Sequence, residues 1–493
     1  MKKIMSPTLT LRSGLALTAA AIAVAFKLIL TNGSLLPGVD GAYYWVQVRS
    51  ILEDLSLAFD DLPLVFYLQA LFSLAVGDIK LGVRISDAVL PALAAIPIYL
   101  MLKKSKQVWL PAVAILAVLL HPVQLYFFTG DFIKNAAAIP VAFFIGWLLF
   151  TWDNRAIKLS IAGLVVCLAI VGLTHFGTLL LCIFMLALWA IFYLRKKPVQ
   201  FWLTSGIVAL GVGALTVVTL AVLVPSRFER LVEFVTQPAT IFEGPFWQFM
   251  FLIRTDVAII FAVFAGQICS LALGFLLWKN RAKLENSAFS LAASSLVTAF
   301  LLSSPLVGIE WASRFIALSF APLFLAAIVL WHSTDRAPLK VNVSALALST
   351  IVISLLLAPS GAKPSAVTDI EYRDLVVASK EFAFPDNSIV VARHGLEFLV
   401  AWEMKTYVIQ EETYLEEDLS SYGSVYLLST DRSAGYGGYN AYDKPPAGKS
   451  ETGKPPTGKV PIDKLPSKGK GGQEATTGEL VYAKGKVTIT KIR

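Results

Sequence analysis

The feature that most constrains the fold of this chain is a series of long apolar runs. Eleven of them are long enough to cross the hydrocarbon core of a bilayer, which takes roughly 17–25 residues. Only 15% of the residues are charged, whereas soluble proteins carry about 25%. The sequence therefore predicts an all-α, multi-pass membrane domain. Its spans lie at about residues 13–31, 80–102, 108–127, 136–152, 157–174, 176–194, 201–224, 256–278, 286–304, 314–331 and 341–358.

Short basic clusters between the runs predict the orientation of the chain. Lys and Arg follow each even-numbered run, at residues 103–106, 155–158, 195–197, 279–283 and 336–340. Basic loops are typical of the cytoplasmic side, so we expect a cytoplasmic N-terminus and acidic loops on the extracytoplasmic side. These clusters account for much of the net charge of +8, and we predict no nucleic-acid partner.

One apolar run, residues 62–76, is too short to be a typical span. We predict a helix that lies at the membrane interface or re-enters the membrane within the first external loop. The alternative is a true span, which would move every later basic loop to the outer side.

Residues 360–493 are predicted to form a separate, small α/β domain outside the cytoplasm, after a membrane domain of residues 1–359. Segments 387–400 and 423–430 are predicted to contain strands, and the alternating C-terminal segment predicts a hairpin. A Lys/Pro/Gly insertion at about 432–472 cannot build a core and is expected to be extended or disordered.

The first external loop begins with GVDGAYYWVQVRS. Asp40 follows the first span, and Tyr43, Tyr44 and Trp45 come next, before Arg49. Such aromatic residues are typical of headgroup depth, so an aromatic belt with solvated charges is one interpretation. The other is a functional site, which the order of acid, aromatics and base at the membrane surface favours.

This order resembles the first external loop of the GT-C glycosyltransferases, and most of all that of the oligosaccharyltransferase catalytic subunit. Four more segments resemble this family in the same order. They are GDIKLGVRISDAVLPAL, FTGDFIKNAAAI, TIFE and WASRFIALSFAP. The resemblance implies a GT-C-like membrane domain of about 11 helices, an interfacial helix in the first external loop, and a sugar donor linked to polyprenyl phosphate.

Two departures from the family pattern concern the acceptor and the acids. The WWDYG acceptor motif is absent, and residues 390–398 occupy the equivalent place. The second external loop has one acid, Asp131, followed by Lys134 and Asn135, where the family usually has two acids. These departures argue against protein N-glycosylation and favour a related transferase with a different acceptor.

The chemistry of sugar transfer assigns roles to these external residues. A carboxylate can act as general base or hold a divalent cation, so Asp40 and Asp131 are predicted to be catalytic. Asp40, Asp131 and Glu243 are predicted oxygen ligands of Mg²⁺ or Mn²⁺. Arg314, at the outer start of a span, is predicted to bind the donor phosphate. Solvated loop acids and a snorkelling Arg are the alternatives.

Four further residues are predicted to contact the acceptor or line the site: Tyr43, Tyr44, His175 and His394. His175 lies between two spans on the predicted outer side, and His394 lies in the place of the family's acceptor motif.

The predicted function is transfer of a sugar from a polyprenyl-(di)phosphate donor to an acceptor glycan, lipid or protein, on the extracytoplasmic face of the cell membrane. Membrane lipid is an expected partner. A transporter or lipid flippase is the alternative, although no internal repeat is evident and the spans are mostly uncharged at their centres. A structural or assembly protein with a degenerate site is the third possibility.

Overall fold

The computed structural model divides the chain into two compact units, which are described separately. The first comprises Met1–Asn32 and Gln47–Lys363, and the second comprises Gly33–Val46 and Pro364–Arg493. The structure describes residues 7–33, 35–129, 132–154, 156–195, 238–245, 257–333, 367–411, 419–430 and 478–492, and the isolated positions 198, 228, 232, 236, 365 and 414. The predicted spans at 201–224 and 341–358 and the insertion at 432–472 lie outside the described residues.

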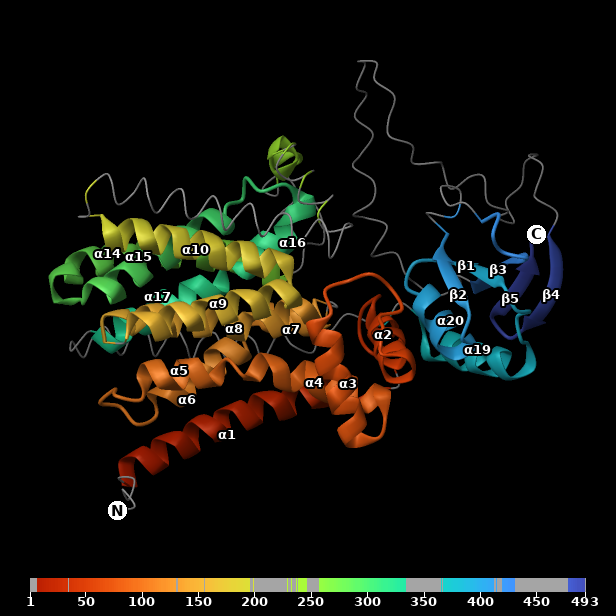
Figure 1. Cartoon of the computed structure of the whole chain (residues 1–493), viewed down its shortest axis with the longest axis horizontal. Coiled ribbons are helices and arrows are strands. Elements are labelled where there is room, and N and C mark those ends of the chain that lie inside the picture. Colours follow the sequence, from red (N-terminus) through yellow and green to blue (C-terminus); the bar gives the residue numbers. More distant parts are fainter. Residues whose placement is uncertain are drawn as a thin grey trace. The chain divides into compact units, whose positions relative to one another are not determined.

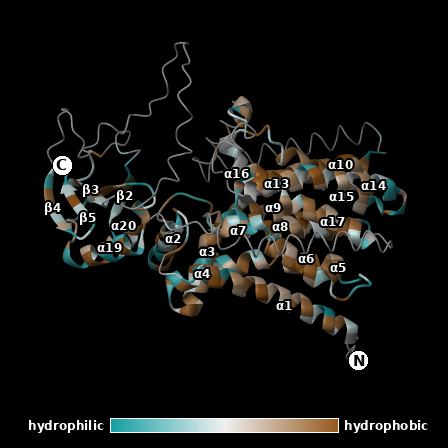
Figure 2. Ribbon diagram, turned by 180° about the vertical axis from the view of Figure 1, so that it is seen from behind, coloured by the Kyte–Doolittle hydropathy of each residue, from teal (hydrophilic) through white to brown (hydrophobic). Residues whose placement is uncertain are grey.

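The first unit is a bundle of helices (Figure 1). Apolar residues run along these helices, and polar residues gather in the connecting loops (Figure 2). The helices are α1 (Pro7–Leu30), α3 (Leu64–Val76), α4 (Ile79–Ala92), α5 (Ala95–Leu102), α6 (Leu110–Leu119), α7 (Pro122–Thr129), α8 (Ile133–Phe150), α9 (Ile157–Thr174), α10 (Phe176–Leu194), α13 (Val257–Phe264), α14 (Ser270–Asn280), α15 (Asn286–Leu302), α16 (Ile309–Leu318) and α17 (Phe320–Ser333). Helix α2 (Gly41–Asp54) belongs to the second unit up to Val46 and to the first unit beyond it.

The predicted polytopic helical fold is confirmed. Seven helical spans in the described part of the chain are long and apolar enough to cross a membrane, and α6 with α7 adds an eighth if they form one bent span. Helices α4 and α5 together make one span, and so do α13 and α14 across a single π-helical turn, Ala265–Cys269. Helix α15 has 17 residues, at the short end for a crossing helix.

The bend between α6 and α7 is 46°. It falls at His121 and Pro122, because proline cannot donate the backbone hydrogen bond that would continue α6 but fits the first turn of a new helix. His121 fills the break. Its Nδ1 accepts a hydrogen bond from the Val123 N–H at 3.2 Å, and its ring stacks on Phe320 at 4.9 Å.

The short apolar run forms helix α3, which has 13 residues and packs against α4. It ends at Gly77, whose φ of +78° is the left-handed conformation that glycine adopts readily at a helix end. Gly82 in α4 permits the close packing, because a Cβ there would lie 2.3 Å from the Cα of Ser73. The short helix agrees with the expectation from the sequence, and its depth in the membrane stays a prediction.

Two opposite charges are buried inside the bundle. Lys27 of α1 is 1% exposed and Asp87 of α4 is 2% exposed. Asp87 accepts a hydrogen bond from Gln69 of α3 at 2.7 Å. The Lys27 ammonium lies 5.6 Å from the ring centre of Phe128 in α7. Lys27 also interacts with the opposite charge of the Asp87 carboxylate. This polar cluster joins four helices.

The second unit contains a five-stranded mixed sheet in the order β2-β1-β3-β5-β4. Its first three strands are parallel, and β5 is antiparallel to both of its neighbours. This confirms the predicted small α/β domain, its two internal strands and its C-terminal hairpin. The elements are α19 (Asp369–Glu381), β1 (Ser388–Ala392), α20 (Glu397–Met404), β2 (Tyr407–Gln410), β3 (Ser424–Thr430), β4 (Glu479–Lys484) and β5 (Val487–Lys491).

Residues 33–46 belong to this second unit, although the sequence analysis assigned them to the membrane domain. Aromatic contacts and a backbone bridge explain the grouping. The Tyr43 ring lies edge-on to Phe398 at 5.0 Å, and Trp45 lies edge-on to Trp402 at 5.7 Å. Gly38 forms a parallel bridge with residue 365. The acidic start of the first external loop is therefore held against α20.

Candidate functional site

The turn that follows β1 is the centre of the candidate site. The N–H of Leu396 donates to the carbonyl of Arg393 at 3.0 Å, and Gly395 has a φ of +84°. A positive φ at the third position defines a type II turn, which favours glycine there. The turn lies at the carboxyl end of β1, where the next strands along the chain, β2 and β3, lie on opposite sides of it. Open α/β sheets bind ligands at such a point.

Two side chains, Glu397 and Gln410, contact His394 in this turn. The Nδ1 atom of His394 lies 3.1 Å from Oε1 of Glu397. The amide nitrogen of Gln410 lies 2.8 Å from the same carboxylate oxygen and 3.1 Å from the same ring nitrogen. The Glu397 side chain is 2% exposed, whereas the His394 side chain is 44% exposed. The ring is thus anchored at one edge while much of it reaches solvent.

A second carboxylate fixes the other side of the turn. Arg393 lies 3.6 Å from Glu371 of α19. Glu371 also accepts hydrogen bonds from the N–H and hydroxyl of Thr368, at 2.7 and 3.0 Å, and from Thr430 at 3.0 Å. Burial acts to raise the pKa of Glu371, but these hydrogen bonds and the charge of Arg393 outweigh it and hold the pKa below its ordinary value.

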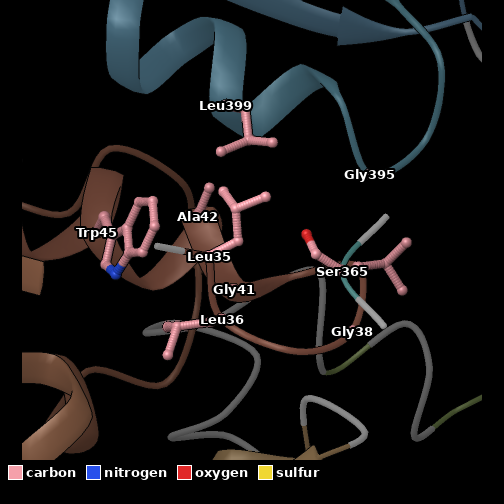
Figure 3. A pocket seen from close by; sticks show the side chains of 10 residues that line it. Leu35, Leu36, Gly38, Gly41, Ala42, Trp45, Ser365, Gly395 and Leu399 are labelled. Atoms are coloured by element: carbon pink, nitrogen blue, oxygen red, sulfur yellow. The ribbon is translucent and has the colours of Figure 1, made fainter. Parts of the chain in front are cut away.

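Asp40 lies beside the same turn. The residues on either side of it, Val39 and Gly41, line a small hollow together with Trp45, Gly395 and Leu399 (Figure 3). Gly395 directly follows His394. The structure therefore brings the segment that carries Asp40 and the turn that carries His394 to the walls of one hollow within the second unit.

The two predicted tyrosines differ in position. Tyr43 is half-buried and packs on Phe398 of α20. Tyr44 is 2% exposed and lies edge-on to Tyr43 at 5.6 Å. Both rings pack within the second unit, and neither is among the side chains that line the hollow.

Two more predicted site segments meet within the first unit. The segment that contains Glu243 follows a short 3-10 helix, Pro238–Phe242. Its residue Pro245 forms an antiparallel bridge with Gly308. Gly308 immediately precedes α16, the helix that contains Arg314. Gly308 allows this approach, because a Cβ there would lie 2.4 Å from the carbonyl oxygen of Glu243. Exposed Arg314 lies 5.5 Å from the ring centre of Trp311.

His175 has a structural position at the junction of α9 and α10. Its Nδ1 accepts a hydrogen bond from the Thr178 N–H at 3.1 Å and contacts the Thr178 hydroxyl at 3.0 Å. This is a helix N-cap, which satisfies a backbone donor that α10 cannot satisfy itself. The cap accounts for histidine at this position without a role in a site.

Asp131 lies outside the described residues, but Lys134, three residues further along the chain, is described. Lys134 forms an ion pair with Asp61 and lies 5.6 Å from the ring centre of Phe66 in α3. Asp61 is 5% exposed. Lys134 thus joins the start of α8 to the loop before α3. The sequence analysis did not single out Asp61.

The predicted metal site stays a prediction. Within the described ranges no three His, Cys, Asp or Glu side chains come close enough together to hold a metal ion. Of the three predicted ligands, Asp40 and Glu243 belong to different units, and Asp131 is outside the described residues.

Glu397 and Gln410 are site residues that sequence reasoning missed. A signal for Glu397 exists, because His394 and Glu397 are three residues apart at the start of a helix. Gln410 offers no such signal, since only the pairing of β2 with β1 brings it beside the turn.

Comparison with known proteins gives similarity in structure but not in sequence. No family model and no curated protein matches the sequence. Among solved structures, an Archaeoglobus fulgidus oligosaccharyltransferase tethered with an acceptor peptide containing the NVT sequon has a TM-score of 0.53. It is 12% identical, over 85% of this chain and 69% of that chain.

Two further structures were solved with polyprenyl phosphates. The archaeal oligosaccharyltransferase AglB from Archaeoglobus fulgidus, in complex with an inhibitory peptide and a dolichol-phosphate, has a TM-score of 0.52. It is 12% identical, over 84% of this chain and 69% of that chain. ArnT from Cupriavidus metallidurans, bound to undecaprenyl phosphate, has a TM-score of 0.50 and is 11% identical, over 98% of both chains. The chain is thus similar in fold to membrane glycosyltransferases of the GT-C superfamily, as its external motifs predicted.

Proposed function

We propose that this chain is an integral-membrane glycosyltransferase of GT-C type. It transfers a sugar from a polyprenyl-phosphate or polyprenyl-diphosphate donor to an acceptor on the extracytoplasmic face. The observation that carries this proposal is the shared hollow, which places the Asp40 segment beside the turn with His394. The similarity in fold to proteins solved with dolichol-phosphate and undecaprenyl phosphate supports a lipid-linked donor.

Asp40 and Asp131 are the proposed catalytic carboxylates. One of them accepts the proton of the acceptor as the acceptor atom bonds to the anomeric carbon. The bond between that carbon and the phosphate oxygen breaks, and the polyprenyl phosphate leaves with the electron pair. A carboxylate suits this role, since it can take a proton at neutral pH when placed against the reacting group.

Positive charge must stabilise the departing phosphate. Arg314 is the proposed donor-binding residue, because a guanidinium offers two parallel hydrogen bonds to phosphate oxygens. Mg²⁺ or Mn²⁺, held by Asp40, Asp131 and Glu243, is the proposed second source of positive charge. The bridge between Pro245 and Gly308 supports a joint role for Glu243 and Arg314, since it ties their two segments together.

The proposed acceptor is a glycan, a lipid or a protein, with Tyr43 and His394 as contacts. Tyr44 and His175 are kept as weaker proposals, because packing and helix capping account for their positions. Membrane lipid surrounds the bundle, and the N-terminus is proposed to be cytoplasmic.

The proposal is tested by incubating the purified full-length protein with a panel of polyprenyl-linked sugars, with Mg²⁺, with Mn²⁺ or with EDTA. Mass spectrometry follows consumption of the donor. Asp40→Asn is expected to lower turnover about a hundredfold or more, the range of general base catalysis. Asp54→Asn is the matched control, an exposed acid in α2, and it is expected to keep full turnover.

Full turnover by Asp40→Asn would remove the proposed mechanism. No consumption of any donor, together with counterflow of a lipid-linked sugar in sealed vesicles, would instead favour a transporter or flippase.

A further inference from the structure

We propose that Trp311 is a positioning residue for the donor phosphate. Its indole ring holds the guanidinium group of Arg314 in the orientation that binds the phosphate of a polyprenyl-linked donor. Trp311 itself does not touch the donor and acts only through Arg314. This inference rests on the proposed function, because it explains how Arg314 is made ready to bind that phosphate.

The first turn of α16 is attached to the segment that carries Glu243. The N–H of Gly308, the residue before the helix, donates to the carbonyl of Ile241 at 2.6 Å. Gly308 also takes part in the antiparallel bridge to that segment. The N–H of Trp311 in turn donates to the Gly308 carbonyl at 3.0 Å. The backbone that carries Trp311 is therefore held at the start of the helix.

The ring of Trp311 packs on Phe315, one turn further along α16. The two rings are stacked, with their centres 5.5 Å apart and their planes at 16° to each other. Such aromatic pairs stabilise a structure by more than the area that they bury. Both side chains are half-buried, whereas Arg314 is exposed. Phe315 therefore fixes the plane of the indole ring beside an exposed cation.

The contact between Arg314 and the ring is a cation–π interaction. The guanidinium carbon of Arg314 lies 5.5 Å from the ring centre of Trp311, within the range of about 6 Å over which this attraction acts. The two residues are three apart, a spacing that makes them neighbours on a helix surface. The attraction acts on the charge of a guanidinium and does not require its N–H groups. It is therefore compatible with two parallel hydrogen bonds to phosphate oxygens.

The α/β domain shows another way to hold an arginine. There Arg393 faces the carboxylate of Glu371 at 3.6 Å. A carboxylate partner adds a negative charge that repels a phosphate, whereas an aromatic ring orients the guanidinium without adding one. Ordering a long side chain before the ligand arrives also lowers the entropic cost of binding. An aromatic partner thus suits an arginine that must bind phosphate.

The test is binding of undecaprenyl phosphate to the full-length protein in phosphatidylcholine nanodiscs, followed by native mass spectrometry. Arg314→Gln is expected to raise the Kd about tenfold or more, because it removes hydrogen bonds from a charged donor. Trp311→Leu should raise it about fivefold, which equals about 1 kcal/mol, the cost of ordering one long side chain on binding. Trp311→Phe, which keeps an aromatic face, should change it less than about twofold. Binding of undecaprenol, which lacks the phosphate, should be equal in all variants.

A second pair of the same kind supplies the matched control. The guanidinium carbon of Arg281 lies 4.0 Å from the ring centre of Trp278, again three residues away, and neither residue belongs to the proposed site. Trp278→Leu should therefore leave the Kd for undecaprenyl phosphate unchanged. In the Arg314→Gln background, Trp311→Leu should cause no further loss, because Trp311 acts through Arg314. An additive loss in the double variant would indicate a role in packing alone and would overturn the inference.

Fluorinated tryptophan at position 311 separates the cation–π attraction from packing. Nonsense suppression introduces rings with one, two or three fluorine atoms, which weaken the negative face of the ring and change its shape little. The affinity for undecaprenyl phosphate should fall stepwise with the number of fluorine atoms, at an unchanged thermal unfolding midpoint. An affinity independent of fluorination would overturn the inference, even if Trp311→Leu binds weakly.

Failure of the inference and failure of the proposed function give different results. Weaker binding in Arg314→Gln with wild-type binding in Trp311→Leu would refute the positioning role and keep Arg314 as the donor-binding residue. Wild-type binding in Arg314→Gln would remove the proposed donor site, and the inference with it. A wild-type protein that binds undecaprenyl phosphate no better than undecaprenol would do the same.

Discussion

The bundle and the α/β domain bury carboxylates in different ways. In the bundle, Asp87 is 2% exposed, and the opposite charge that interacts with it is Lys27. The Lys27 ammonium makes no hydrogen bond within the described residues. In the α/β domain, Glu371 is 6% exposed and accepts hydrogen bonds from a backbone N–H and from two hydroxyl groups. Asp87 also accepts a hydrogen bond from Gln69 at 2.7 Å. The same kind of side chain is thus bonded by side-chain donors in one region and by a backbone N–H together with hydroxyl groups in the other.

The difference follows from the backbone around each group. Helices that span a membrane satisfy their own N–H and C=O groups, so a carboxylate inside a span, such as Asp87, is bonded by side chains. Loops and helix ends in the α/β domain leave N–H groups that a carboxylate can bind. Glu371 takes such a group in the capping box at the start of α19.

The largest expected effect is in the bundle, for Asp87→Leu. Removing one member of a buried charge pair leaves the other uncompensated, which costs about 3–5 kcal/mol. We expect a lower thermal unfolding midpoint in nanodiscs. The double variant Lys27→Met, Asp87→Leu should recover most of this loss, because it leaves no buried charge behind. A double variant no more stable than Asp87→Leu would show that the two charges do not compensate each other.

Glu371→Gln in the α/β domain is expected to cost about 2 kcal/mol at pH 7, since it weakens several hydrogen bonds to a charged acceptor. The folded protein holds the pKa of Glu371 below its ordinary value of 4.5. Its contribution is therefore present above pH 4.5 and is lost as the pH falls through the lower, folded-state pKa.

Hydrogen exchange of β1 and β3 in the full chain measures this effect. Wild type and Glu371→Gln should differ in protection at pH 7 and converge at acidic pH. A difference that stayed constant with pH would mean that packing, rather than the ionised carboxylate, supplies the stability.

The fold of the bundle was predictable because each span carries its own signal. Residues 157–174 and 176–194 were predicted as two spans and form α9 and α10 with the same bounds. The strand in residues 387–400 was also visible, since a short β-branched run at a turn indicates a strand. Local patterns of this kind need no knowledge of distant residues.

The attachment of the Asp40 segment to the α/β domain was not predictable. It depends on Tyr43 meeting Phe398 and Trp45 meeting Trp402, and the sequence pattern near Tyr43 is equally typical of a membrane interface. His394 was found through the family resemblance, but its partner Gln410 was not. Its position depends on strand register, which places it opposite Ala392.

Gly395→Ala is expected to have a smaller effect, about 1 kcal/mol, because the φ of +84° is costly for a residue with a Cβ. Thermal unfolding measures the loss, and the His394 NMR signal should broaden as the turn loosens. Gly274→Ala in α14 is the matched control, since a Cβ there meets no atom within 4 Å. That control should be neutral or slightly stabilising. Equal losses for both variants would contradict a special role for the turn.

The smallest effect is expected for Glu381→Gln, at an exposed carboxylate of the same domain. Glu381 pairs with Lys484 and accepts a hydrogen bond from Tyr482 at 3.0 Å, and these partners lower its pKa, as the partners of Glu371 do. Water competes for its charge, however, and exposed ion pairs contribute little. We expect no resolvable change in the protection of β4 and β5 against hydrogen exchange, with or without 1 M salt. A loss as large as that of Glu371→Gln would mean that the number of partners, rather than burial, decides how much a carboxylate stabilises this domain.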